Sequence, residues 1–313
     1  MNCFNRRWYC AALAASMLTL FLIACGQPAT DGQVVQGTAT ARPPTPTRTT
    51  GSIHPGMDEI GDFDNVIVHT QVAGFLIITG GKRILIDALF QVHNPPSPAE
   101  RVVAMREGLP PFNDIDLILV THTHEDHFDA NLVGNNMLNN PQAVFVSSEV
   151  AVSVLEDRFR GFEQIQDRVI GVRLGRGEQE QMIVAGIDLD IICLSHGVPS
   201  VPNLGYIFSA DDISFFHTGD MNPNYVTVSD LHAYGLPERQ IDIALVSGYH
   251  LTRERFADYF LEGIQPTVKV PMHFNFSGEG VSDILSEIET EFPNAILFRE
   301  EMTWQAIDPG MLE

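Results

Sequence analysis

Four potential metal ligands follow one short apolar run, and this combination restricts the fold more than any other feature of the chain. The run covers residues 117–120, and the ligands are His122, His124, Asp126 and His127. A short, uncharged run of branched residues is typical of a strand buried on both faces. Open α/β sheets bind their ligands just beyond the ends of such strands. The stretch therefore predicts a metal site at the edge of a sheet.

The spacing within this cluster favours a site for two metal ions. His122, His124 and Asp126 are two residues apart, so an extended segment presents them on one side. His127 joins them only if the chain turns, and a helix beginning near Asp129 would supply that turn. Neutral imidazole and carboxylate suit Zn²⁺, Mn²⁺ or Fe²⁺, and two ions in one site lie about 3.5–4 Å apart. We expect Zn²⁺ first, with Mn²⁺ and Fe²⁺ as alternatives.

Three single residues at predicted strand ends are candidates for the remaining ligands. His196, Asp220 and His273 each follow an apolar run and precede a loop. Two metal ions need about eight to ten ligand positions between them. A lone histidine at a strand end is usually structural. Each of these residues is therefore a candidate ligand only in combination with the cluster at residues 122–127.

The chain from residue 57 onward alternates between β-rich runs and helix-like segments. This order predicts an α/β domain in which two sheets pack face to face with helices outside. Strands are expected at residues 65–70, 75–79, 83–86, 116–120, 143–147, 169–174, 181–184, 187–194, 204–209, 213–217, 241–246, 267–270 and 295–298. Helices are expected at residues 97–108, with Ser97 as the cap, and at residues 129–139, 149–159, 229–234, 253–263 and 281–292.

The ordered set of motifs resembles that of the metallo-β-lactamase-fold hydrolase superfamily. The resemblance extends over about residues 63–309, and it implies a four-layer αββα sandwich. Its motifs are His-Thr-His-Glu-Asp-His at residues 122–127, His196, Thr-Gly-Asp ending at Asp220, and Pro-Met-His-Phe around His273.

Two further features refine this resemblance. Asp87 follows an early apolar run and matches the aspartate that braces the histidine loop in such proteins. The sequences at residues 74–77, 203–206, 217–220 and 271–273 look most like the branch that contains ascorbate-phosphate lactonase-like and uncharacterised metal-dependent hydrolases.

The resemblance also implies a role for each ligand. It assigns His122, His124 and His196 to a first metal, Asp126, His127 and His273 to a second, and Asp220 to a bridge between them. A bridging water with a lowered pKa would become hydroxide and attack a carbonyl or phosphoryl centre. Asp126 or Asp220 would orient that hydroxide and relay its proton.

The bridging aspartate bears on the substrate class. The β-lactamases of this fold generally lack it, so Asp220 favours a lactone, another ester or a phosphodiester of a small molecule. The alternative is a non-catalytic metal-binding surface lipoprotein that binds a ligand or partner. The complete ligand set favours the hydrolase.

Several residues near the predicted site have weaker support. Tyr206, Tyr249, His250 and Asn275 lie on or near strand-end loops and are candidate substrate contacts, although packing or loop hydrogen bonds are the favoured explanation for them. His217 lies within a strand and is expected to support the ligands or the core. Cys193 is expected to be a small buried apolar side chain, and His69 has no supporting context.

The overall charge limits the partners. A formal net charge of -22 disfavours nucleic acid, which is bound through clustered Lys and Arg. Anionic membrane surfaces are disfavoured for the same reason.

The first 25 residues predict export and a lipid anchor. Arg6 and Arg7 precede an uncharged apolar segment, residues 8–24, which ends in Leu-Ile-Ala before Cys25. This resembles a bacterial lipoprotein signal peptide, residues 1–24, with Cys25 as the lipidated residue. An ordinary secretory signal or an uncleaved anchor is the alternative. Residues 25–56 are rich in Thr and Pro and predict a tether, and residues 57–313 the catalytic domain.

Overall fold

The computed structural model describes residues 60, 63–92, 95–276 and 278–312. The expected signal peptide, Cys25 and most of the tether region lie outside the described residues, so lipidation and export stay predictions. Among the residues described, none of the helices combines the length and the apolar character needed to span a bilayer.

Two sheets form the centre of the described domain. The first sheet has the order β13-β1-β2-β3-β4-β5-β6, and the second has the order β12-β11-β10-β9-β8-β7. The first comprises β1 (Val66–Gln71), β2 (Gly74–Thr79), β3 (Lys82–Ile86), β4 (Leu117–Leu119), β5 (Val144–Ser148), β6 (Val169–Val172) and β13 (Thr303–Ala306). The second comprises β7 (Gln179–Val184), β8 (Ile187–Cys193), β9 (Leu204–Ala210), β10 (Ile213–His217), β11 (Ile243–Ser247) and β12 (Val268–Met272).

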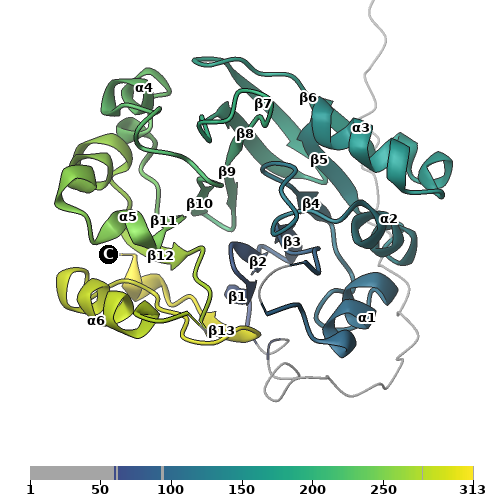
Figure 1. Cartoon of the computed structure of the whole chain (residues 1–313), viewed down its shortest axis with the longest axis horizontal. Helices are drawn as coiled ribbons and strands as arrows, with labels where there is room; N and C mark the ends of the chain where they lie inside the picture. Colours follow the sequence, from purple (N-terminus) through teal and green to yellow (C-terminus); the bar gives the residue numbers. More distant parts are fainter. Residues whose placement is uncertain (1–59, 61–62, 93–94, 277, 313) are drawn as a thin grey trace, which may run out of the picture. The chain divides into compact units, whose positions relative to one another are not determined.

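Helices cover the outer face of each sheet (Figure 1). They are α1 (Ala99–Glu107), α2 (Ala130–Asn139) and α3 (Glu149–Arg158) beside the first sheet, and α4 (Val228–Ala233), α5 (Gly248–Leu251) and α6 (Val281–Glu291) beside the second. One apolar core lies between the sheets, and one lies between each sheet and its helices. The predicted αββα sandwich is confirmed.

Strand β4 illustrates why the sequence folds this way. Leu117 and Leu119 belong to the core between the sheets, whereas Ile118 and Val120 belong to the core under the helices. Successive side chains of a strand point to opposite faces, so a strand buried on both faces must be apolar throughout. Burial of this run therefore fixes where the strand stops and where the polar cluster begins.

Strand direction gathers the candidate ligands at one edge. Strands β3 and β4 are parallel, so Asp87 and His122 follow them at the same end. In the second sheet β10, β11 and β12 are parallel to one another. Strand β8 runs in the same direction, because β8 and β10 are both antiparallel to β9, which lies between them. His196, Asp220 and His273 consequently leave their strands at one end of that sheet.

The structure corrects three sequence-based expectations about elements. Residues 253–263 form a 3₁₀ turn (Glu254–Phe256) and a π-helix (Tyr259–Ile264) instead of an α-helix, and the Tyr259 hydroxyl there donates to the Pro223 carbonyl oxygen (2.7 Å). Residues 295–298 form no strand; Ile296 and Phe298 are buried between the sheets, which explains their apolar alternation.

The final strand is β13, four residues later, and the sequence pattern missed it. Ser97 is not a helix cap either. Pro98 occupies the N-cap position of α1, and the Ser97 hydroxyl donates to Gln71 Oε1 (2.7 Å). The Ser97 hydroxyl therefore makes a tertiary hydrogen bond instead of capping the helix.

Candidate metal centre

The histidine loop after β4 has the predicted shape. The backbone carries no regular structure from Thr121 to His124 and then turns, with the amides of His127 and Phe128 donating to the His124 carbonyl oxygen (3.1 and 3.0 Å). Helix α2 follows, and its N-cap Asp129 accepts from two amides of the first turn. The turn brings His127 to the same region as His122 and His124.

Asp87 braces this loop from inside the first sheet. Its carboxylate is fully buried and accepts hydrogen bonds from the Thr121 amide (2.8 Å) and the Thr121 hydroxyl (2.6 Å). It also lies 2.8 Å from Nδ1 of His127, which leaves Nε2 of that ring facing the site. Both Asp87 oxygens are engaged, so Asp87 orients a ligand instead of serving as one.

The first group of ligand atoms comes from His122, His124, His196 and Asp220, all within 4.8 Å of one another. Nε2 of His122 lies 3.0 Å from Nδ1 of His124, and the His196 ring centroid lies 4.9 Å from that of His122. Three imidazoles around one point match the first site that the sequence implies.

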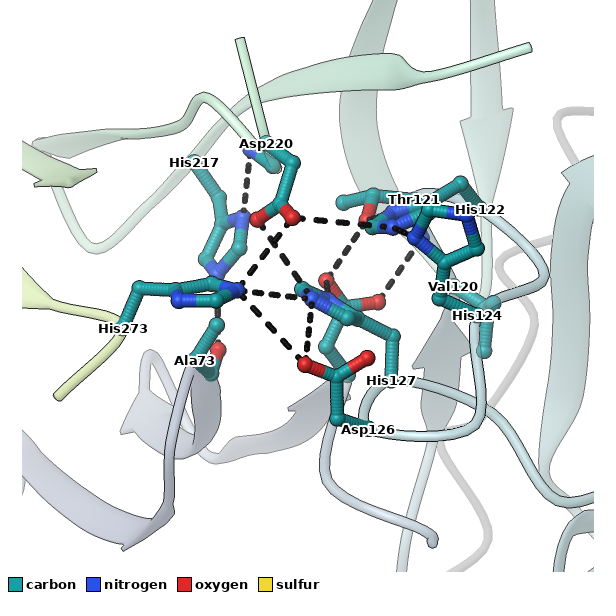
Figure 2. Close-up of polar contacts among 12 residues, drawn as sticks. Ala73, Val120, Thr121, His122, His124, Asp126, His127, His217, Asp220 and His273 are labelled. Atoms are coloured by element: carbon teal, nitrogen blue, oxygen red, sulfur yellow. Dashed lines mark hydrogen bonds and ion pairs between the residues drawn. The ribbon is translucent and has the colours of Figure 1, made fainter. Parts of the chain in front are cut away.

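The second group comes from Asp126, His127 and His273, also within 4.8 Å of one another. Nε2 of His127 lies 3.3 Å from Nε2 of His273, and Asp126 Oδ2 lies 3.7 Å from the latter nitrogen. Figure 2 shows these three side chains converging from the loop and from the end of β12.

Asp220 lies between the two groups (Figure 2). Its Oδ2 is 3.4 Å from Nε2 of His196 and 3.2 Å from Nε2 of His273, and its Oδ1 is 3.4 Å from Nε2 of His127. One carboxylate therefore contacts histidines of both groups. This is the position expected of a shared ligand.

The cluster strongly perturbs the pKa values of its members. Burial, together with neighbouring His127, lowers the pKa of His122 to about 2. Burial also opposes charge on His127, but the carboxylates of Asp220 and Asp87 outweigh it and raise the pKa of His127 well above its usual value. Burial would raise the pKa of Asp220, yet His127 and His273 lower it well below the usual range. Positive charge is thus favoured between the two groups.

The donor set fits metal ions. Both ring nitrogens of His196 are buried and make no hydrogen bond, and Nε2 has only the long 3.4 Å contact with Asp220 Oδ2, which is costly unless another group satisfies them. Imidazole nitrogens within 3.3 Å of one another in a buried cluster are likewise suited to a shared cation. Imidazole with carboxylate suits Zn²⁺, Mn²⁺ or Fe²⁺.

Two residues that support Asp220 differ in how well the sequence revealed them. His217 is fully buried, and its Nδ1 accepts from the Gly219 amide (3.1 Å). Asn203 was not among the predicted site residues, yet its Oδ1 accepts from the Asp220 amide (3.0 Å) and its amide donates to the Thr218 carbonyl oxygen. A polar residue directly before a buried strand is the signal that could have identified it.

Two cavities meet at His273. A cavity of about 190 Å³ is lined by His196, Asp220, Met221, Asn222, Ser247, His250 and His273. A cavity of about 450 Å³ is lined by Val72, Val92, Glu125, Asp126, Tyr249, His273 and Asn275. Of the predicted substrate contacts, His250 therefore faces the smaller space, and Tyr249 and Asn275 face the larger.

Tyr206 does not lie in either cavity, so its expected role as a substrate contact is corrected. It is fully buried between the sheets, and its hydroxyl donates to the Val120 carbonyl oxygen (2.7 Å). An aromatic side chain in the middle of β9 points into the core. Tyr206 instead fixes the end of the run that leads into the histidine loop.

The chain is similar to a known protein family and to known metal-dependent hydrolases. The family described as Beta-lactamase superfamily domain matches residues 82–274. A UPF0173 metal-dependent hydrolase of Pyrococcus horikoshii is 30% identical over 202 residues, which cover 63% of this chain and 80% of that protein.

Two solved structures share the fold. Igni18, a metallo hydrolase of Ignicoccus hospitalis, aligns with a TM-score of 0.53 at 19% identity, over 78% of this chain and 99% of that one. An isothiocyanate hydrolase from Delia radicum gut bacteria aligns with a TM-score of 0.51 at 14% identity, over 78% and 99%. At these identities the likeness is one of fold alone.

Proposed function

This chain belongs to the β-lactamase superfamily and is a metal-dependent hydrolase of the UPF0173 family, and from that premise we propose that it cleaves an ester-type bond of a small molecule with two metal ions. Zn²⁺ is the ion we expect in both positions, with Mn²⁺ and Fe²⁺ as alternatives. The bond is that of a lactone, a carboxylic ester or a phosphodiester.

The position of Asp220 carries the proposal of two ions. Its two oxygens contact His196 on one side and His127 and His273 on the other at 3.2–3.4 Å. A single ion would use one histidine group and leave the other imidazoles clustered without a cation. We therefore assign His122, His124 and His196 to one ion, Asp126, His127 and His273 to the other, and Asp220 to both.

Two divalent ions held in these positions would lower the pKa of a water molecule and polarise the oxygen of the scissile bond. The protein side chains then have separate tasks. Asp220 holds the two histidine groups together, with 19% of its side chain exposed. Asp126 is more exposed, at 36%, and lines the larger cavity. We assign Asp126 the task of taking up the proton of the attacking water at a carboxylate oxygen.

The two cavities suggest how a substrate is oriented. The larger one has apolar walls from Val72 and Val92 and polar groups from Tyr249 and Asn275. The smaller one presents Ser247 and His250 beside His196 and Asp220. We propose that the larger cavity takes the main body of a small molecule and that His250 hydrogen-bonds the leaving group in the smaller one.

A substrate screen tests this function. The metal-loaded protein is assayed with a lactone, an aryl carboxylic ester, a phosphodiester and a β-lactam, beside a His122→Ala variant and a Glu149→Ala control on the remote helix α3. We expect hydrolysis of at least one of the first three substrates, which His122→Ala abolishes and Glu149→Ala retains. Hydrolysis confined to the β-lactam, or activity unchanged in His122→Ala, would contradict the proposal.

We also propose that the protein is exported and anchored to a bacterial membrane through a lipid on Cys25, with residues 1–24 removed. The apolar segment that ends in Leu-Ile-Ala-Cys supports this proposal. In cells that make the full chain, the protein is expected in the membrane fraction and a Cys25→Ser variant outside it. An unchanged distribution of the variant would contradict lipid anchoring.

A further inference from the structure

His69 is a buried titratable residue outside the ligand set, with 2% of its surface exposed. The rings of Phe75, Phe276 and Phe298 surround it, with centroids 5.1–5.6 Å from its own. Its Nε2 lies 3.2 Å from the Val72 carbonyl oxygen. Its Nδ1 lies farther, 3.4 Å, from the carbonyl oxygen of Glu300. We place the ring proton on Nε2, where the contact is shorter, so that His69 donates to Val72.

The same Val72 carbonyl oxygen accepts a second hydrogen bond, from the His273 amide (2.9 Å). Both residues adopt left-handed backbone conformations, with φ of 42° at Val72 and 67° at His273. This conformation is unfavourable for any L-residue, and especially for a β-branched one, so the surroundings must impose it. A carbonyl held by His69 therefore fixes the backbone of a candidate metal ligand.

The next carbonyl in the chain, that of Ala73, contacts His217, which lies three residues before the candidate ligand Asp220. The Ala73 carbonyl oxygen accepts from Nε2 of His217 (3.0 Å). Nδ1 of the same ring accepts from the Gly219 amide, immediately before Asp220. Figure 2 shows His217 between Ala73 and Asp220. Of two consecutive carbonyls in one turn, one thus bonds the His273 amide, and the other bonds His217, which holds the residue before Asp220.

The turn also abuts the brace of the first sheet. A Cβ added at Gly74 would lie 2.6 Å from the Asp87 carbonyl oxygen and 3.0 Å from Cα of Ala88. Only a glycine permits such close approach of two backbones. The turn therefore packs directly on Asp87, the residue that orients His127.

We propose that the β1–β2 turn, Val72 and Ala73, sets two ligands of the second sheet, His273 and Asp220, against those of the first, with His69 and His217 as its positioning residues. This inference rests on the two-metal centre proposed above. The two positioning residues affect different numbers of metal sites. His69 acts on His273, a ligand of the second group alone, whereas His217 acts on Asp220, which contacts both groups.

A matched pair of variants tests the His69 route. In His69→Gln the amide nitrogen takes the place of Nε2 and keeps the bond to Val72, whereas in His69→Asn it takes the place of Nδ1 and reaches toward Glu300. Zn²⁺ is titrated into the metal-free full chain, and the affinities of the two sites are measured. Loss of an outer hydrogen bond to a ligand typically costs about 10–100-fold in metal affinity.

We expect His69→Asn to weaken one of the two sites by that factor and to leave the other unchanged, while His69→Gln stays close to wild type. His217→Leu should weaken both sites. Equal affinities in the two His69 variants, or equal weakening of both sites by His69→Asn, would overturn the proposal. Binding of fewer than two ions by wild type would remove its basis, whereas two bound ions without hydrolysis would contradict only the proposed activity.

Amide exchange in the wild-type protein provides a measurement that needs no variant to fold. In the metal-free protein the His273 amide, bonded to Val72, is expected to exchange far more slowly than the amides of exposed Glu279 and Gly280. Exchange at the same rate as those two residues would overturn the proposal.

Discussion

The two halves of the candidate metal centre, one from each sheet, are built in different ways. The first-sheet half comes from one loop of six residues, 122–127, which supplies three histidines and an aspartate after a single strand. The second-sheet half comes from three strand ends, with one ligand each at His196, Asp220 and His273. The first half is largely determined by local sequence, whereas the second exists only when the strands of a sheet are aligned.

The difference extends to how each half is held. One buried carboxylate, Asp87, braces the whole loop through Thr121 and His127. On the other side Asp220 is held through Asn203, and His273 is held through the Val72 carbonyl oxygen. The locally built half thus shares one brace, whereas Asp220 and His273, which follow separate strands, each have a support of their own.

The largest effect is expected where the halves join. Asp220→Asn keeps the shape of the side chain but removes the negative charge shared by His196, His127 and His273. We expect kcat to fall by about 1000-fold, which corresponds to about 4 kcal/mol of transition-state stabilisation. Steady-state kinetics on the substrate found in the screen measures this, and a fall of less than about tenfold would contradict the shared role of Asp220.

A smaller effect is expected at the brace of the first half. Asp87→Asn places an amide nitrogen against either Thr121 or His127, so one of the hydrogen bonds that orient the loop is lost. Metal affinity should fall by about 10–100-fold. Asp116→Asn removes a carboxylate from the same sheet away from the site and is the control. Equal metal affinities in the two variants would argue against the brace.

The contact between the start of β2, next to the β1–β2 turn, and Asp87 is expected to be sensitive to added volume. A Cβ at Gly74 meets backbone atoms of Asp87 and Ala88, whereas a Cβ at Gly171 on β6 first meets a side-chain methyl of Val152 at 3.3 Å. Overpacking against rigid backbone typically costs about 1–3 kcal/mol. Urea unfolding should show that cost for Gly74→Ala and little change for Gly171→Ala. Similar stabilities of the two variants would indicate that the turn can move away from Asp87.

The smallest effect concerns His250 at the rim of the second half. Burial, together with neighbouring Arg253, lowers the pKa of His250 to about 4. Between about pH 6.5 and 4 the unfolded chain binds a proton that the folded His250 does not, so stability falls as the pH falls through this range. In metal-free protein His250→Gln should lose less stability than wild type between pH 7 and 4.5. Urea unfolding at both pH values measures this, and parallel losses would contradict it.

The sequence was sufficient to predict what local pattern and burial determine. The apolar run at residues 117–120, the turn at His127 and the cap of α2 at Asp129 all follow from nearby residues. His196, Asp220 and His273 were found because each follows a buried strand. These strands run in the same direction, and their common direction brings the three residues to one end of the sheet.

The remaining features depend on partners far away in the chain. Tyr206 has the same sequence context as a pocket residue, but its strand turns that side chain into the core. His69 has no motif around it, and its positioning role follows only from its contacts with Val72 and Glu300, which the sequence does not reveal. The helix expected at residues 253–263 has suitable spacing, yet contacts such as that of Tyr259 with Pro223 accompany a π-helix in its place.

The number of metal ions per chain tests the central claim most directly. Elemental analysis of protein purified without chelator is predicted to give two ions for wild type, and one each for His196→Ala and His273→Ala, because each variant removes a ligand from one group. A single ion in the wild-type protein, unaffected by one of the two substitutions, would contradict a centre that holds two ions.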